Sequence, residues 1–289
     1  MLDHIHSTLR VSLKYLKLAP GTIDSLTNAI ACVAYGLRAS HLVDLHLPLD
    51  RSRDLLDMLK RNPDSKDLVL LQFGDRFTFF ANVVRLRQHY ETTLAKDTSA
   101  YIDIQGKQPV LRDCPSQLTD WLTHNLKPFL DNRPPRDILF LPTVPTCMVT
   151  LTGWALEYPV IYTSHQDSDT LDSELDEWEV RTNCLGGRCL NVVRILIDGH
   201  VLVHNNVDDH KNEHALRPAA QNTPKQETQM MLLSFSYPAT LLTKEHQLKI
   251  QSDLDTKINH RLQDSTTAWL KAAQVKVIRE QVNLDRVAL

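Results

Sequence analysis

Asp44 and His46 are the two residues of this sequence whose types and spacing are best suited to chemistry. They lie in an apolar run, 42–47, that predicts a β-strand ended by Pro48. Because alternate residues of a strand point to the same side, the two side chains would project together. A carboxylate beside an imidazole can orient a general base or hold a metal ion. In the structural alternative, Asp44 caps the following loop and His46 is a solvent-facing edge residue.

A second candidate site begins at Asn183 and Cys184, which precede Leu185. Cys184 would be a nucleophile if its thiol were ionised, and Asn183 can bond to backbone groups at a turn. The structural alternative is a buried cysteine beside a turn asparagine. His165 ends a strand predicted over 158–164, and it would approach Asp44 if the two strands were neighbours. The candidate catalytic residues are therefore Asp44, His46, His165, Asn183 and Cys184.

The motifs of several large enzyme classes are missing from the sequence. It has only 8 glycines, and none forms a Gly-x-Gly-x-x-Gly or P-loop pattern that would hold the phosphates of a nucleotide. It also has no Gly-x-Ser-x-Gly elbow and no His-Glu-x-x-His pair. The sequence therefore argues against common dinucleotide enzymes, P-loop hydrolases, α/β-hydrolases and zincin proteases, and the cofactor is left unknown.

Charge and hydropathy are those of an ordinary globular protein. The 289 residues include 32 Lys and Arg against 35 Asp and Glu, which predicts no general binding to nucleic acid. The stretch 138–156 contains no charged residue, but Pro142 and Pro145 interrupt it, so we expect no membrane span. The 5 cysteines form no Cys-x-x-Cys pair, no Asn-x-Ser/Thr sequon occurs, and the amino terminus lacks the features of a signal peptide. These features predict a reducing cytoplasmic or nuclear location.

The apolar periodicity predicts an α/β fold, or α+β as the alternative, in a single domain over 1–289 with a mixed sheet. Two amino-terminal helices are expected on either side of Pro20, and a hairpin is expected around Gly74. Further segments are a strand over 190–197 paired with 201–204, an acidic loop near 165–181 and a mobile polar loop near 205–227. A long helix is expected over 244–271. Its predicted apolar face is Ile250, Leu254, Ile258, Leu262 and Trp269, with Lys249, Asp253, Lys257 and Arg261 on other faces.

Five stretches, in order along the chain, resemble one uncharacterised eukaryotic protein family, which in humans is represented by a chromosome-1 open-reading-frame product. They are Leu42–Leu45, Tyr158–Tyr162, Asn183–Leu185, Ser234–Pro238 and Val282–Leu289. Asp44 matches the family pattern, whereas the residues after it and the segment 186–189 depart from it. The resemblance implies no established activity, so it assigns no role to any of the candidate residues.

Two hypotheses follow for the function. The first is a non-catalytic binding or scaffold protein, which contacts a protein partner through the acidic or polar loop. The second is an enzyme of unrecognised class that uses Asp44 with His46 or His165 as acid and base or as metal ligands. A deep pocket lined by Asp44, His165 and Asn183 would favour the enzyme, and a shallow surface there would favour the binding protein. The first hypothesis is preferred because the familiar catalytic motifs are missing.

Overall fold

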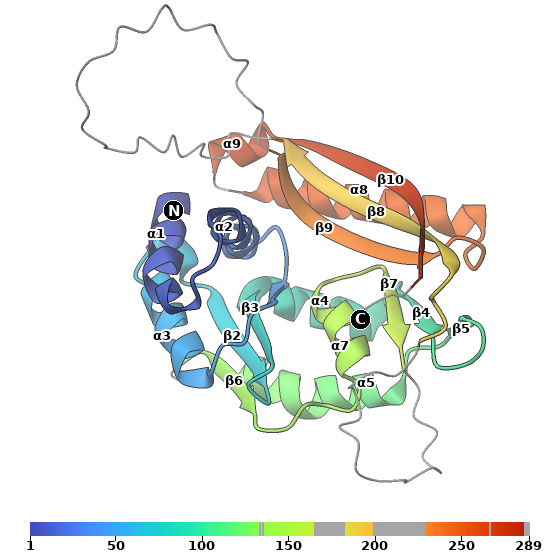
Figure 1. Ribbon diagram of the computed structural model, residues 1–289, viewed down its shortest axis with the longest axis horizontal. Helices are drawn as coiled ribbons and strands as arrows, with labels where there is room; N and C mark the ends of the chain where they lie inside the picture. The colour runs from blue at the N-terminus through green and yellow to red at the C-terminus, as the bar shows by residue number, and fades with distance from the viewer. Residues whose placement is uncertain (133, 135, 165–182, 199–228, 266, 286–289) are drawn as a thin grey trace, which may run out of the picture.

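The computed structural model describes residues 1–132, 134, 136–164, 183–198, 229–265 and 267–285. The acidic loop predicted near 165–181 and the polar loop predicted near 205–227 lie outside these ranges, and so does His165. Helices alternate with short strands along the described chain, and the sheets contain both parallel and antiparallel pairs (Figure 1). The predicted α/β class is therefore confirmed.

The strands divide among three small sheets, whereas the sequence predicted one mixed sheet. Sheet A has the order β1-β3-β2-β6, and its strands are Ser40–Val43, Phe77–Asn82, Leu68–Phe73 and Ile138–Leu141. Sheet B has the order β5-β4-β7, formed by Val110–Arg112, Ala100–Asp103 and Val160–Thr163. Sheet C has the order β10-β8-β9, formed by Gln274–Leu284, Arg188–Asp198 and Gln229–Pro238. Parallel pairs join β2 to β6 and β4 to β7, and sheet C is antiparallel.

The two predicted amino-terminal helices are present, and the other helices lie between and around the sheets. The principal α-helices are α1 Leu2–Ser12, α2 Pro20–Ala34, α3 Leu49–Leu59, α4 Val83–Lys96, α7 Met148–Ala155 and α8 Lys244–Asp264. A longer helical segment is built from α5 Ser116–Trp121, a π-helical turn Leu122–Leu126 and α6 Lys127–Asp131. The wide turn precedes Pro128, which has no N–H to donate and whose ring crowds the carbonyl four residues earlier.

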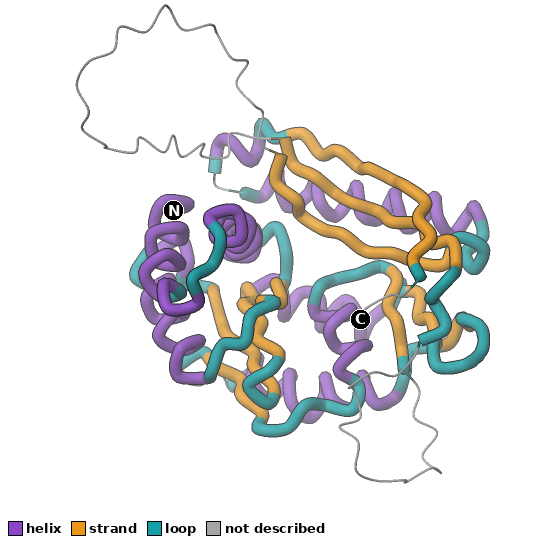
Figure 2. Tube along the Cα trace, in the orientation of Figure 1, coloured by secondary structure: helices purple, strands orange, loops and turns teal. Residues whose placement is uncertain are grey.

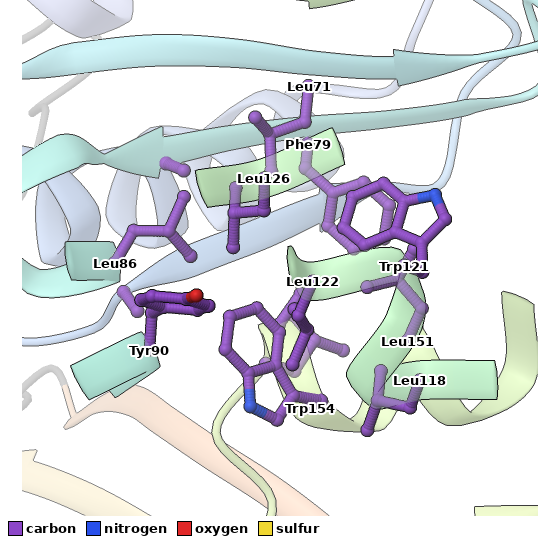
Figure 3. Close-up of a cluster of buried hydrophobic side chains, with 14 of the residues drawn as sticks. Leu71, Phe79, Leu86, Tyr90, Leu118, Trp121, Leu122, Leu126, Leu151 and Trp154 are labelled. Atoms are coloured by element: carbon purple, nitrogen blue, oxygen red, sulfur yellow. The ribbon is translucent and has the colours of Figure 1, made fainter. Parts of the chain in front are cut away.

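Sheet A is covered on both faces, which explains why β2, apolar at every position except Gln72, is buried along its whole length. One face packs on α1, α2 and α3. The other face packs on an aromatic core from the helix around 116–131 and from α7, where Trp121 and Trp154 are central (Figure 3). Tyr101 and Ile161 of sheet B also pack into this core. These helices fill the space between the two sheets, so the strands could not join into one.

Sheet C and α8 form a separate layer, with α8 lying along one side of the three strands (Figure 2). The apolar stripe predicted for this helix is largely confirmed, because Leu254, Ile258 and Leu262 are buried in one core with side chains of sheet C. The helix is shorter than predicted. It ends at Asp264, and Trp269 belongs to a separate short helix, α9 Ala268–Lys271. The backbone of Ser265 turns to φ −61° and ψ 138°, which cannot continue a helix.

Two strand predictions are corrected. The strand predicted over 42–47 is β1, Ser40–Val43; its pairing with β3 ends at Val43 and Thr78, and only Phe77 of β3 remains before the hairpin turn, so residues 45–47 have no described strand beside them. The turn of that hairpin is as predicted, since Gly74 and Asp75 have φ values of 55° and 53°, which favour these residue types. The strand predicted over 190–197 is β8, but both of its edges are taken by β9 and β10. The segment 201–204, its expected partner, lies outside the described residues.

Candidate functional site

A small open hollow contains both Asp44 and His46. It has a volume of about 230 Å³ and is lined by Leu42, Val43, Asp44, Leu45, His46, Arg76 and Phe77. Two segments build it: the chain that leaves β1 and the tip of the β2–β3 hairpin. The alternation expected of a strand persists beyond the end of β1, because Asp44 and His46 are exposed while Leu47 is buried. The two side chains therefore reach the same hollow from a loop and not from a strand.

The hollow has an apolar lining with polar groups of both signs. Leu42, Leu45 and Phe77 are half-buried, and Asp44, His46 and Arg76 add a carboxylate, an imidazole and a guanidinium. Within the described chain, no hydrogen bond joins Asp44 to His46. Drug-sized ligands occupy pockets of roughly 300–1,000 Å³, so the volume here is below that range. The hollow is open to solvent, and of the candidate catalytic residues it contains Asp44 and His46 but not Asn183.

Two polar side chains stand next to this hollow with atoms that lack a partner. Thr78 is the register partner of Val43, and Gln72 is opposite Thr78 on β2. The Nε2 group of Gln72 donates to the Leu47 carbonyl at 2.6 Å. The Oε1 atom of Gln72 and the Oγ1 atom of Thr78 are buried with no hydrogen-bond partner among the described residues. Buried polar atoms usually have a hydrogen-bond partner. These two atoms are therefore an unusual polar feature of the end of sheet A that lies next to the hollow.

Asn183 and Cys184 form a turn at a different sheet. The Asn183 Oδ1 atom accepts a hydrogen bond from the Leu185 amide at 3.1 Å, and the Cys184 amide donates to the Ile104 carbonyl at 3.0 Å. The first bond is internal to the turn, and the second attaches it to the residue that follows β4 in sheet B, whereas Asp44 follows β1 in sheet A. Burial raises the pKa of the Cys184 thiol, which keeps it protonated near neutral pH. The structure thus joins Asp44 to His46 in one hollow but places Cys184 elsewhere.

A buried ionic cluster around Glu157 was missed by the sequence analysis. The Glu157 carboxylate accepts bonds from both terminal nitrogens of Arg261 at 2.7 Å each and from the Ala39 amide at 2.7 Å. Lys257 Nζ lies 2.7 Å from Oε1 of the same carboxylate. Arg261 also donates to the Leu37 carbonyl at 3.0 Å. The cluster joins the α2–β1 turn, the end of α7 and the helix α8.

The local conformation of Glu157 is unusual for its residue type. It follows the end of α7 with a φ of 60°, in the left-handed region where glycine is the usual helix-ending residue. A non-glycine residue there carries backbone strain. The carboxylate contacts explain why Glu157 occupies this position, since glycine would relieve the strain but remove the ion pair. Burial alone would raise the pKa of Glu157, but Lys257 and Arg261 outweigh it and hold that pKa well below its usual range.

Arg261 corrects the predicted polar face of α8. Lys257 and Arg261 were expected to lie away from the core, but Arg261 is only 8% exposed and Lys257 is half-buried. The two are four residues apart and so lie on one side of the helix, next to the stripe that packs on sheet C. The sequence contains one sign that this carboxylate could be buried: Glu157 is the first charged residue after the uncharged run 138–156. Because the Glu157 carboxylate bonds to two cations of α8 and to the Ala39 amide, the cluster holds these segments together and has a structural role.

His89 of α4 is a second buried polar group in this region. Its ring stacks on Trp154 with centroids 4.5 Å apart and an interplanar angle of 21°. The His89 Nε2 group donates to the Trp154 carbonyl at 2.9 Å, and the Trp154 Nε1 group donates to Thr93 Oγ1 at 2.9 Å. Burial lowers the pKa of His89 to about 4. The neutral ring therefore helps to fix the end of α7, from which Glu157 extends.

We expect His89 to make stability depend on pH. Its folded pKa of about 4 is below the ordinary 6.5, so the unfolded state binds more protons between these values and stability falls as the pH falls through that window. The His89→Gln variant should lose less stability over the window in urea titrations than the wild type. Burial lowers the pKa of His41 to about 3, which acts with the same sign, so the dependence should shrink without vanishing. An unchanged slope in His89→Gln, with the exposed control His260→Gln also unchanged, would contradict this role.

The comparisons with known proteins give one match. No curated protein and no solved structure matches the chain. No group of three or more His, Cys, Asp or Glu side chains able to hold a metal ion occurs in the described part of the chain. No described helix is long and apolar enough to cross a membrane. A family model for a domain of unknown function matches residues 14–207, a range that includes the hollow, Glu157 and Cys184. The chain therefore belongs to the family of that domain, DUF4504, whose function is unknown.

Proposed function

We propose that the protein is a non-catalytic binding protein and that the hollow around Asp44 and His46 is its docking site. The observation that carries the proposal is the combination of an apolar lining with exposed groups of both signs in an open hollow of about 230 Å³. Interfaces between proteins combine an apolar centre with a polar rim. The hollow resembles that pattern on a small scale, because Leu45 and Phe77 are half-buried while Asp44 and Arg76 are exposed.

The proposed occupant is a short segment of a protein partner. One apolar side chain of that segment would contact Leu42, Leu45 and Phe77, and a basic residue beside it would face Asp44. The volume is below the range of small-molecule pockets but suits a single anchoring side chain. The loop that leaves β1 and the tip of a hairpin are both segments that proteins commonly use for binding.

The alternative proposal is an enzyme of unrecognised class that uses Asp44 with His46 or His165, with Asn183 and Cys184 as further candidate catalytic residues. Support for binding over catalysis comes from three observations on the described residues. Asp44 and His46 are exposed, no described hydrogen bond orients one against the other, and the Cys184 turn belongs to another sheet. A catalytic acid or base must be held within hydrogen-bond reach of the proton it moves.

We further propose that the protein resides in the cytoplasm or nucleus of a eukaryotic cell and folds as one domain. The five cysteines are all free thiols, which fits a reducing compartment. The formal net charge of −3 supports the proposal that nucleic acid is not a general partner. The Glu157 cluster supports a single folding unit, because it joins α2, α7 and α8 from separate parts of the chain.

A peptide selection against the folded full-length chain tests the binding proposal. Selected peptides should share an apolar residue next to a basic residue, and Asp44→Lys should weaken their binding on the order of tenfold because it reverses a rim charge. The matched control is Asp50→Lys, which changes an exposed aspartate at the start of α3 outside the hollow. Titration by fluorescence anisotropy measures both affinities. Equal weakening by the two variants, or none by either, would contradict the proposal.

A further inference from the structure

The strand β10 is the longest exposed sheet edge among the described residues. It has 11 residues, whereas both edge strands of sheet A have 4 and those of sheet B have 3 and 4. In the described chain β10 pairs only with β8, so one side of its backbone is open. The other edge strand of sheet C, β9, packs against α2 and β7. In Figure 1, β10 forms the outer margin of sheet C, away from these elements.

Most side chains of β10 are exposed to solvent. The exposed residues are Gln274, Lys276, Arg279, Glu280, Gln281, Asn283 and Leu284. On the face that carries Lys276 and Glu280, Ile278 is half-buried and Met231 of β9 is 50% exposed. An open strand with unpaired N–H and C=O groups is a template for a further strand. Natural proteins often protect such edges with charges, so the arrangement of the charges decides whether this edge attracts or repels a copy of itself.

The charges of β10 are self-complementary about Ile278. If two copies pair antiparallel across a two-fold axis at Ile278, each residue faces the one at the same distance on the other side of the axis. Lys276 of each copy then faces Glu280 of the other, and this pair occurs twice. Opposite charges placed directly across two strands stabilise the pairing, and like charges oppose it. Arg194 of β8, which already pairs with Glu280 in the same chain, would extend this contact into a network.

We infer that the chain forms a homodimer through antiparallel pairing of β10 with β10 of a second copy, centred on Ile278. The pairing joins the two three-stranded sheets into one of six strands. It satisfies the open backbone edge with main-chain hydrogen bonds and sets the register through the two Lys276–Glu280 pairs. The hollow at Asp44 lies in sheet A, so the dimer would present two copies of it. The inference does not depend on the proposed function.

A charge-exchange experiment on the full chain tests the dimer and its register together. Lys276→Glu places Glu opposite Glu280 twice, and Glu280→Lys places Lys opposite Lys276 twice. Each variant alone should dimerise on the order of tenfold more weakly than the wild type in sedimentation equilibrium. A mixture of the two variants restores both opposite-charge pairs. Native mass spectrometry of the mixture should therefore show a heterodimer.

Lys271→Glu changes an exposed lysine of α9 outside β10 and should leave the dimer unchanged. Circular-dichroism melts identify any variant that fails to fold, and Lys276→Gln then serves as a milder change at the same position. A wild-type chain that stays monomeric at micromolar concentration would overturn the inference and identify the charges as edge protection. A dimer that persists unchanged in both single variants, or a mixture without the heterodimer, would overturn the β10 register.

Discussion

Replacing Glu157 with glutamine should lower the free energy of unfolding by about 3–5 kcal/mol, the cost typical of breaking a buried ion pair on one side. The neutral amide would leave the Arg261 guanidinium buried without a counter-charge, and Lys257 would lose its partner. Chemical denaturation measures the loss. The matched control is Glu245→Gln, an exposed glutamate at the start of α8, which should change stability by no more than about 0.5 kcal/mol.

The pH dependence of this loss gives a second check on the same cluster. The folded pKa of Glu157 is held below its ordinary value of 4.5, so its contribution to stability is present above that value. It declines as the pH falls from that value toward the lower folded pKa, because the unfolded state then binds a proton that the native carboxylate does not. The difference between wild type and Glu157→Gln should therefore narrow in acid. A difference that stays constant below pH 4.5 would show that the ion pair is not its source.

Truncation of the buried stripe of α8 should have an effect of similar size. Ile258 is 5% exposed, and Ile258→Ala should cost about 2–5 kcal/mol because it removes apolar contacts and leaves a cavity. The neighbouring Asn259 is exposed, so Asn259→Ala should stay within about 0.5 kcal/mol. Lys257 is unsuited as the control because it contacts Glu157. Equal denaturation midpoints for the two variants would mean that α8 does not pack on the core.

Local signals predicted the local elements of this fold. The stripe Leu254, Ile258 and Leu262 repeats at four-residue steps, which is enough to place a helix and choose its buried side. Gly74 and Asp75 predicted the hairpin because their turn needs positive φ at both positions. In each case the information lies within a few residues, and the tertiary structure did not override it.

Long-range pairing could not be read in the same way. The strand predicted at Leu42 extended too far toward Leu47, because its own sequence does not show that pairing with the distant β3 stops at Val43. The division into three sheets depends on helices that fill the space between strands. The ion pair of Glu157 with Arg261 spans 104 residues, and neither residue carries a local mark of its partner. A basic residue beside an apolar stripe is more often on the solvated face, so the pattern favoured the wrong side for Arg261.

The candidate site was predicted in part. Asp44 and His46 do reach one hollow, although they reach it from a loop. Arg76 and Phe77, which complete the hollow, come from a hairpin tip that the sequence could not place beside them. Asn183 proved to bond to the backbone in a turn, as its structural alternative proposed, and Cys184 belongs to that same turn.

The most direct test of the binding proposal is to locate the contact of a selected peptide. Hydrogen exchange with mass spectrometry on the full-length chain, with and without the peptide, measures protection along the backbone. The proposal predicts new protection over 42–46 and 76–77, and its loss in Asp44→Lys. Protection at other segments only, or protection that Asp44→Lys leaves unchanged, would contradict the assignment of this hollow as the binding site.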